Sequence, residues 1–233
     1  MKSIDVCLTH NQLNNYDHIG KVIVVIDVLR ATSTINTILY HGAKLVKPVK
    51  TLEECKKLKD ENYIIMAERM GKKVEGFDYG NSPTKINRNQ IKGCKVAIAT
   101  SNGTKAIIKT KGSKISLIAS FLNISKVINF INKESEDTLL VCSGWQGSAN
   151  LEDTLCAGGI ISGLNDYNKI SDIALIAKKL YKSSKNNILE EMMKSSHAKR
   201  LSRYDNILDI EFCSKLNTQP IIPILKDDFL TLM

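Results

Sequence analysis

Short apolar runs alternate with longer segments of helical periodicity over most of the chain. The run at residues 21–26 is β-branched and, after Lys21, apolar at every position, which is typical of a strand buried on both faces of a sheet. Similar runs predict further strands, and the segments between them predict helices. We expect strands at 21–26, 44–49, 63–67, 95–99, 114–119, 138–142 and 221–225, and helices at 33–40, 51–59, 122–132, 150–163 and 171–199, with one more helix ending at 110.

This alternation predicts an α/β fold whose mostly parallel central sheet is covered by helices on both faces. Pro48 places the end of a strand, or an edge strand, at 44–49. Thr51 and Glu54 have the spacing of a capping box at the start of a helix. No linker or low-complexity tract interrupts the pattern, so we expect a single domain over residues 1–233.

The composition narrows the class of protein. Hydrophobic residues make up 43% of the chain, which argues against disorder, and no apolar run reaches the ~18 residues that a membrane span needs. The first residues lack the apolar core of a signal peptide, so we expect a cytoplasmic protein without a membrane partner. The six cysteines are scattered, with no C-x-x-C pair, and we expect reduced, mostly buried thiols.

The net charge of +9 allows two interpretations, a nucleic-acid surface or a lysine-rich surface that attracts a small anion. The lysines are spread thinly and the chain has one Trp, so few rings are available to stack on bases. We therefore expect a small anionic substrate and no nucleic-acid partner. Whether the chain forms a homo-oligomer stays open.

The loop after the 21–26 strand holds the first candidate site. In parallel α/β sheets, ligands bind beyond the carboxyl ends of the strands. Asp27 stands at such an end, where a carboxylate is suited to a hard cation such as Mg²⁺. Arg30 follows with a fork suited to phosphate, and Thr32 and Ser33 supply hydroxyls at a helix start. A helix cap, or an ion pair between Asp27 and Arg30, is the alternative.

Other strand-end loops repeat this character. The loop at 100–104 combines hydroxyl, amide and glycine residues, and the loop at 143–148 could cradle a phosphate, although each could also be an ordinary turn. Carboxylates follow at the start of the next helix and after the third strand. The candidates are Ser101, Asn102, Gly103, Thr104, Ser143, Gly144, Glu68, Arg69, Asp78, Glu152 and Asp153.

Several known phosphatase and nucleotide motifs are absent. The aspartate-nucleophile motif D-x-D is broken by Leu29, and the position that a cysteine phosphatase fills with Arg after Cys142 is Ser148. No P-loop motif occurs. The four histidines lack metal-ligand spacing, and His197 is expected to be a surface residue.

Taken together, the motifs resemble those of the 2-phosphosulfolactate phosphatase family across nearly the whole chain. The stretches that carry the resemblance are Val25-Ile-Asp-Val-Leu-Arg-Ala-Thr-Ser-Thr34, Ala67-Glu-Arg69, Gly76-Phe-Asp-Tyr-Gly-Asn-Ser-Pro83, Thr100-Ser-Asn-Gly-Thr104, Cys142-Ser-Gly144, Asn150-Leu-Glu-Asp-Thr-Leu-Cys-Ala-Gly158 and Ser196-His-Ala-Lys-Arg-Leu201. The resemblance implies a three-layer α/β/α fold with a mostly parallel or mixed sheet. It also implies Mg²⁺-dependent hydrolysis of (2R)-2-phospho-3-sulfolactate to 3-sulfolactate and phosphate, in coenzyme M biosynthesis.

On this basis we expect distinct roles for the candidates. Catalytic roles fall to Asp27, Arg30, Glu68 and Arg69, and the Mg²⁺ ligands are sought among Asp27, Asp78, Glu152 and Asp153. The remaining candidates are expected to bind substrate: Thr32, Ser33, Ser101, Asn102, Gly103, Thr104, Ser143 and Gly144. Metal-assisted attack by water and an aspartyl phosphate on Asp27 are both open. The alternatives are an acid phosphatase of other phosphorylated 2-hydroxy acids and a non-catalytic module that binds an anion or nucleotide.

Overall fold

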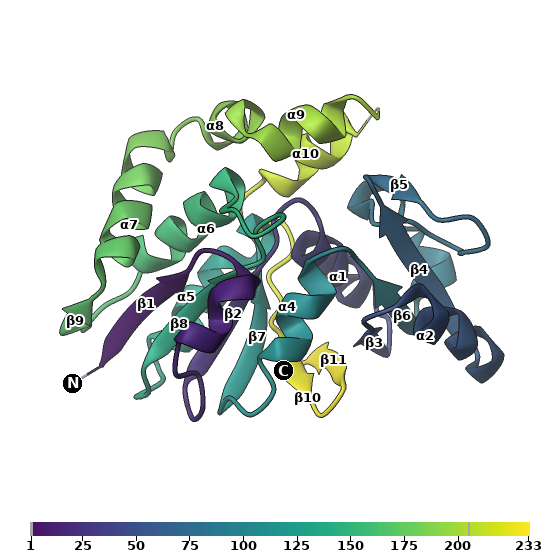
Figure 1. The fold of residues 1–233 in the computed structure, drawn as a ribbon, viewed down its shortest axis with the longest axis horizontal. Coiled ribbons are helices and arrows are strands. Elements are labelled where there is room, and N and C mark those ends of the chain that lie inside the picture. The colour runs from purple at the N-terminus through teal and green to yellow at the C-terminus, as the bar shows by residue number, and fades with distance from the viewer. Residues whose placement is uncertain (1, 205) are drawn as a thin grey trace.

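The computed structural model describes residues 2–204 and 206–233. Within them, eleven strands form one sheet in the order β5-β4-β6-β3-β11-β10-β7-β2-β8-β1-β9 (Figure 1). The strands are β1 (Ser3–Cys7), β2 (Val22–Ile26), β3 (Leu45–Pro48), β4 (Tyr63–Arg69), β5 (Lys72–Lys73), β6 (Lys95–Ala99), β7 (Ile115–Ala119), β8 (Thr138–Cys142), β9 (Lys169–Ile170), β10 (Pro223–Lys226) and β11 (Phe229–Leu232). The α-helices are α1 (Ala31–Tyr40), α2 (Leu52–Lys57), α3 (Arg88–Ile91), α4 (Gly103–Lys109), α5 (Ile124–Ile131), α6 (Leu151–Ser162), α7 (Asp172–Ser184), α8 (Ile188–Lys194), α9 (Ser196–Ser202) and α10 (Ile207–Cys213).

The sheet is mixed and largely parallel, as expected. Strands β4, β6 and β3 pair in parallel on one side, and β7, β2, β8, β1 and β9 do so on the other. The hairpin of β10 and β11 lies between the two groups and is antiparallel to both of its neighbours. The end of the chain therefore joins the two halves of the sheet.

Alternation along β2 explains the layers. Val22, Val24 and Ile26 belong to a core that includes α5, α6 and α7, whereas Ile23 and Val25 belong to a second core with α1 and α4. All five residues of β2 are buried, because helices cover both faces. This confirms the α/β fold of three layers.

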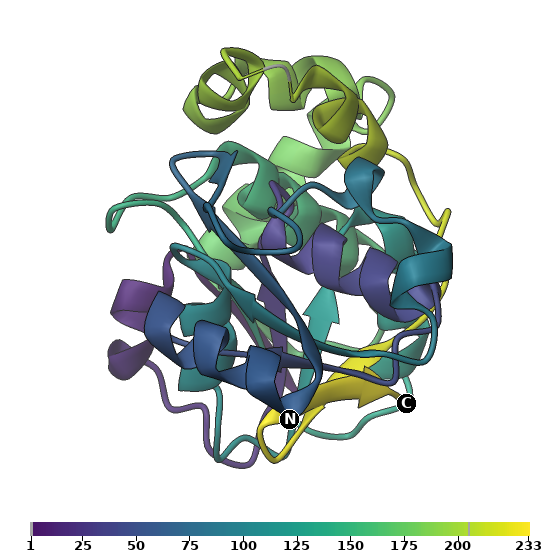
Figure 2. The ribbon, with the colours of Figure 1, turned by 90° about the vertical axis from the view of Figure 1, so that its right-hand side faces the viewer.

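The last helices form a separate layer at one end of the molecule. Both views show α8, α9 and α10 together above the sheet (Figures 1 and 2). The sequence predicted one helical segment over 171–199, but the structure divides it into α7, α8 and α9. Ser195 ends α8 with an extended backbone and caps α9, where its side chain accepts a hydrogen bond from Ala198 N. We call α8, α9 and α10 the C-terminal helical layer.

Smaller features refine the predicted pattern. Thr51 and Glu54 form the capping box at the start of α2. Pro48 is the last residue of β3, which lies inside the sheet between β6 and β11, so the proline marks a strand end and not an edge. The sequence pattern missed β1, which pairs with β8 and β9. In the described part of the chain, no helix combines the length and apolar character that crossing a membrane requires.

Candidate active site

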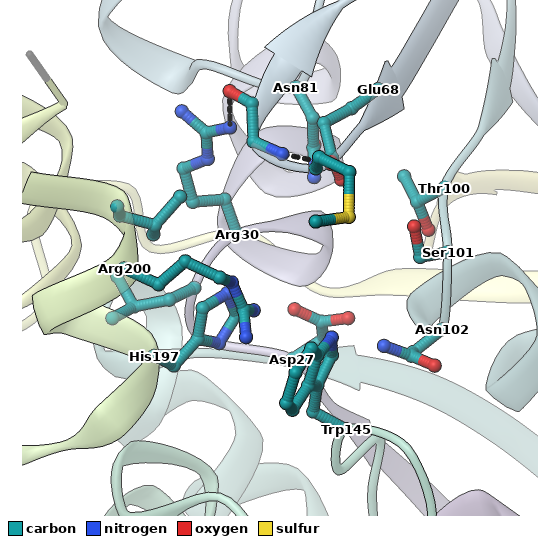
Figure 3. A pocket seen from close by; sticks show the side chains of 14 residues that line it. Asp27, Arg30, Glu68, Asn81, Thr100, Ser101, Asn102, Trp145, His197 and Arg200 are labelled. Atoms are coloured by element: carbon teal, nitrogen blue, oxygen red, sulfur yellow. Dashed lines mark hydrogen bonds between the residues drawn. The ribbon is translucent and has the colours of Figure 1, made fainter. Parts of the chain in front are cut away.

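A small cavity of about 50 Å³ lies beneath the C-terminal helical layer, where β2, β4 and β6 end (Figure 3). Its walls come from the segments at the ends of β2, β4 and β6, from the loop that contains Asn81, from the turn after β8 and from α9. Polar and charged side chains dominate the lining, and several point toward one another in the close view. The lining residues are Asp27, Leu29, Arg30, Glu68, Met70, Gly71, Asn81, Thr100, Ser101, Asn102, Trp145, His197, Arg200 and Leu201.

Asp27 lies at the floor of the cavity, one residue beyond β2. Its Oδ1 accepts a hydrogen bond of 3.1 Å from Ala31 N, and its backbone N–H donates to Thr32 Oγ1 at 3.0 Å. These bonds fix the turn from β2 into α1. Burial raises the pKa of Asp27; the charge of His197 and the Ala31 N–H oppose this, and the charge of Glu152 adds to it. The carboxylate is therefore held in a position where a cation would stabilise it.

The ends of β2 and β6 meet at Gly103, the first residue of α4. A Cβ built on Gly103 would lie 2.3 Å from Ala31 Cβ and 2.6 Å from Asp27 Oδ2. Only a residue without a side chain allows α4 to approach Asp27 this closely. This approach carries Ser101 and Asn102, just before α4, into the wall of the cavity.

Arg30 is buried, and two other parts of the chain hold its guanidinium. Its Nη1 pairs with Asp209 Oδ2 of α10 at 2.5 Å, and its Nη2 donates to Gly71 O at 3.1 Å. The other carboxylate oxygen of Asp209 accepts hydrogen bonds from Ser82 Oγ and Thr84 Oγ1, at 2.8 and 2.6 Å. The C-terminal helical layer is thus attached through Asp209 to the arginine that the sequence assigned to phosphate.

Two carboxylates of α6 lie behind Asp27. Asp153 Oδ1 accepts from Val28 N at 2.8 Å, and its Oδ2 accepts from Gly144 N at 3.4 Å. Burial, the charge of Asp27 and the charge of Glu152 all raise the pKa of Asp153 well above its usual range. A cation next to these three buried carboxyl groups would stabilise their ionised forms.

The buried Glu152 pairs with the partly exposed His197. Glu152 Oε1 lies 2.9 Å from His197 Nδ1, and Glu152 Oε2 is buried without a hydrogen-bond partner in the described chain. The contact fixes the ring of His197 at the cavity and leaves one carboxylate oxygen available for a ligand. Among residues 2–204 and 206–233, no three His, Cys, Asp or Glu side chains lie close enough together to bind a metal ion by themselves.

The predicted site residues divide into three groups. Asp27, Arg30, Glu68, Ser101 and Asn102 line the cavity. A second group does not line the cavity, and most of its polar atoms form hydrogen bonds within the protein. The hydroxyl of Thr32 accepts a hydrogen bond from Asp27 N, and that of Ser33 donates one to Val28 O. Thr104 Oγ1 forms hydrogen bonds with the backbone of Thr100, and Gly144 N donates to Asp153. Ser143 Oγ is buried without a partner, and the group also includes Gly103, Glu152 and Asp153.

Arg69 and Asp78 form the third group, which the structure does not bring into this cavity. Alternation along β4 turns Arg69 away from the face that carries Glu68, and its guanidinium donates to Glu68 O at 2.7 Å. Asp78 accepts from Ile65 N at 2.9 Å and pairs with Lys59, beside the middle of β4. Both carboxylate oxygens of Asp78 are occupied at a distance from Asp27.

The candidates did not include five polar or aromatic lining residues: Asn81, Thr100, Trp145, His197 and Arg200. The histidine was expected at the surface because its helix shows no ligand spacing. The available signal is the stretch at 196–201, which contains His197 and Arg200 and carries part of the family resemblance. Asp209 was also missed, since nothing in its local sequence connects it with Arg30, 179 residues away.

The cavity is suited to an anionic ligand that undergoes proton or phosphoryl transfer. Arg30 and Arg200 supply positive charge, Ser101, Asn102 and Asn81 supply neutral polar groups, and the buried carboxylates can hold a cation. An arginine beside a phosphoryl group stabilises the charge of its transition state.

Comparisons with known proteins point to the same chemistry. The family model described as 2-phosphosulpholactate phosphatase matches residues 7–228. Proteins named "Probable 2-phosphosulfolactate phosphatase" are similar along most of their length. The one from Pseudothermotoga lettingae is 43% identical over 89% of this chain and 90% of its own. The one from Thermotoga maritima is 44% identical over 87% and 88%, and the one from Clostridium tetani is 36% identical over 97% and 98%.

Proposed function

The chain belongs to the 2-phosphosulpholactate phosphatase family, and from that premise we propose that it is a phosphoric monoester hydrolase that converts 2-phosphosulfolactate to 3-sulfolactate and phosphate. The observation that carries the proposal is that a buried, fixed Arg30 and Asp27 line the same cavity at the strand ends. Arginine binds the phosphoryl oxygens, and the carboxylate supplies the negative group that a metal or a proton requires.

The phosphoryl group would lie between Arg30 and the loop at 100–102. The two bonds that Arg30 makes to Asp209 and Gly71 use one N–H of each terminal nitrogen and leave other donors of the fork for the substrate. Ser101 and Asn102 face the same space (Figure 3). The first backbone N–H groups of α1 bind Asp27, so the polar groups at 101–102, and not those amides, complete the cradle.

The donor set fits Mg²⁺ in the way this ion is usually bound, by one or two carboxylates together with water and the substrate. The hydrogen bond from Ala31 N uses Asp27 Oδ1 and leaves Asp27 Oδ2 for a ligand, and Glu152 Oε2 is buried without a hydrogen-bond partner among the described residues. We assign these two oxygens to the metal. Asp153 lies behind them; the charges of Asp27 and Glu152 raise its pKa, and a bound cation would lower it again. A bound Mg²⁺ would polarise the phosphoryl oxygens and lower the pKa of a bound water.

His197 would provide the proton that the leaving oxygen of sulfolactate needs. Because Nδ1 is held by Glu152, Nε2 is the nitrogen left to act in the cavity. Transfer of the proton from Nε2 to the ester oxygen would accompany cleavage of its bond to phosphorus, so that sulfolactate leaves as an alcohol. Water would form the new P–O bond, and its proton would pass to Asp27 or stay with the released phosphate. We prefer direct attack by water to an aspartyl phosphate intermediate. Radiolabelled phosphate that stays bound to the enzyme after an acid quench would instead indicate the covalent route.

The decisive experiment measures phosphate release from racemic 2-phosphosulfolactate with Mg²⁺ and with EDTA, beside phospholactate and phosphoglycolate. Release that EDTA abolishes, with preference for the sulfonated ester, supports the reaction and the metal. Asp27→Asn should lose at least ~100-fold in rate. Release from the other esters alone would make the chain an acid phosphatase of different hydroxy acids, and no release from folded protein would favour a binding module.

Further expectations accompany the proposal. Six cysteines are free, as suits a reducing cytoplasm, where we place the reaction. The product is the compound that the family resemblance assigns to coenzyme M biosynthesis. We expect no nucleic-acid partner, and sedimentation of the purified protein would decide whether it forms a homo-oligomer.

A further inference from the structure

The two arginines of the cavity differ in their charge partners. Arg30 is paired with the buried Asp209 at 2.5 Å. Arg200, on α9, has no carboxylate within 4.0 Å among residues 2–204 and 206–233. Burial lowers the pKa of Arg200, and the charges of Glu68 and Glu152 act on it from beyond ion-pair distance. Arg200 is thus a cation at the cavity whose charge the protein leaves uncompensated nearby.

Trp145 holds the guanidinium of Arg200 in place. The guanidinium carbon lies 4.1 Å from the centre of the indole ring, which is the geometry of a cation–π contact (Figure 3). The indole is itself positioned by a tight turn, in which Trp145 and Ser148 exchange two backbone hydrogen bonds of 2.9 Å. A stacked arginine keeps the N–H groups of its edge free, so it can bind an oxyanion with two hydrogen bonds.

We propose that Arg200, stacked on Trp145, binds the sulfonate of the substrate and thereby selects sulfonated over unsulfonated phosphate esters. This inference rests on the proposed function. The phosphoryl group has its own arginine, Arg30, at the strand ends, together with Ser101 and Asn102. Arg200 reaches the cavity from the C-terminal helical layer instead, so a substrate with two strong anions would be held between two elements. The planar fork matches the oxygens of a sulfonate as well as those of a phosphate.

The experiment compares kcat/KM for 2-phosphosulfolactate and for 2-phospholactate, which lacks the sulfonate. Arg200→Ala should lower the value for the sulfonated ester by about 10- to 100-fold, because a charge-assisted contact is lost. The value for phospholactate should stay close to that of the wild type. Arg200→Lys keeps the charge but loses the planar fork, so its loss on the sulfonated ester should be intermediate.

Arg203→Ala is the matched control, because Arg203 ends the same helix and is exposed. It should leave the ratio of the two kcat/KM values unchanged. Equal losses on both esters in Arg200→Ala would overturn the proposal and place Arg200 at the phosphoryl group. Unchanged kinetics on both esters would also overturn it. Thermal melts of each variant verify that the comparison is made between folded proteins.

Calorimetric binding of 3-sulfolactate and lactate separates this inference from the proposed function. If wild-type protein releases no phosphate from 2-phosphosulfolactate, the proposed function fails. Selective binding of sulfolactate that Arg200→Ala weakens would still support the sulfonate site. Equal binding of sulfolactate by the wild type and Arg200→Ala would overturn the site, even if phosphate release is normal.

Discussion

Replacing Asp209 by Asn tests whether the C-terminal helical layer holds Arg30 in place. The substitution is nearly isosteric and removes one buried negative charge. Asn Oδ1 can still accept the hydrogen bonds from Ser82 and Thr84, but an N–H₂ group would face Arg30 Nη1, where a donor now meets an acceptor at 2.5 Å. The change therefore isolates the ion pair from the rest of the contact.

The expected loss follows from the burial of both groups, since the side chains of Arg30 and Asp209 are 3% and 2% exposed. Removing one partner of a buried pair costs about 3–5 kcal/mol, because the other charge is left uncompensated. Gly71 O still accepts from Arg30, so we expect the lower end, about 3 kcal/mol. For a chain of this size that lowers the Tm by roughly 6–12 °C. The kcat/KM should fall at least ~10-fold as Arg30 leaves the phosphoryl site.

Urea unfolding and steady-state kinetics measure the two effects on the same samples. Glu211→Gln is the control, because Glu211 is exposed on the same helix and its charge should matter by less than about 0.5 kcal/mol. The double variant Arg30→Met with Asp209→Leu removes both charges and should regain most of the stability, but not the activity. An Asp209→Asn protein as stable as Glu211→Gln would refute the assigned role of the pair. So would a double variant that regains the activity.

Three further substitutions test other parts of the structure. In an exposed helix, Gly→Ala raises the free energy of unfolding by about 1 kcal/mol. At Gly103 the added methyl group meets Ala31 and Asp27, so thermal melts should show a loss of stability of about 1–3 kcal/mol and kinetics a lower kcat/KM. A stabilised Gly103→Ala variant would contradict the close approach of α4 to Asp27. Asp78→Asn should keep kcat/KM within about twofold of the wild type, because the carboxylate of Asp78 lies away from the cavity. A large loss of kcat/KM in a folded variant would instead indicate that Asp78 is a metal ligand. Thr51→Ala should lose about 1 kcal/mol in urea unfolding through its capping box, with unchanged activity; an unchanged midpoint would speak against the cap.

Local patterns were sufficient for much of the sheet and for one half of the site. Residues 22–26 form a strand because apolar β-branched side chains are stable when covered on both faces, and the carboxylate that follows must lie beyond the strand end. The strands β6 and β8 are predicted in the same way, with the loops that follow them. Hence Asp27, Arg30, Ser101 and Asn102 could be named from their place in the sequence, and all four line the cavity.

The other half of the site depends on contacts that no local pattern encodes. His197 and Arg200 lie on a helix that crosses the ends of the strands, and their neighbours Glu152 and Trp145 are about fifty residues away in sequence. Arg69 shows the converse, since its sequence position next to Glu68 suggested a site residue, yet the pleat of β4 turns it to the other face. Adjacency in sequence and adjacency in space differ most where a strand alternates or a distant helix covers it.

The sequence by itself determined most of the central strands and the helices that follow them, because the period of apolar positions indicates which backbone conformation buries them. It also determined which strand ends carry polar groups, since charge is excluded from a strand that is buried on both faces. Only the tertiary structure decided that the β10–β11 hairpin enters the middle of the sheet and that α9 and α10 lie over the strand ends. The positions of the hairpin and of these helices depend on the burial and pairing of segments far apart in the chain, such as the ion pair of Asp209 with Arg30. They are therefore reached only when the whole core forms.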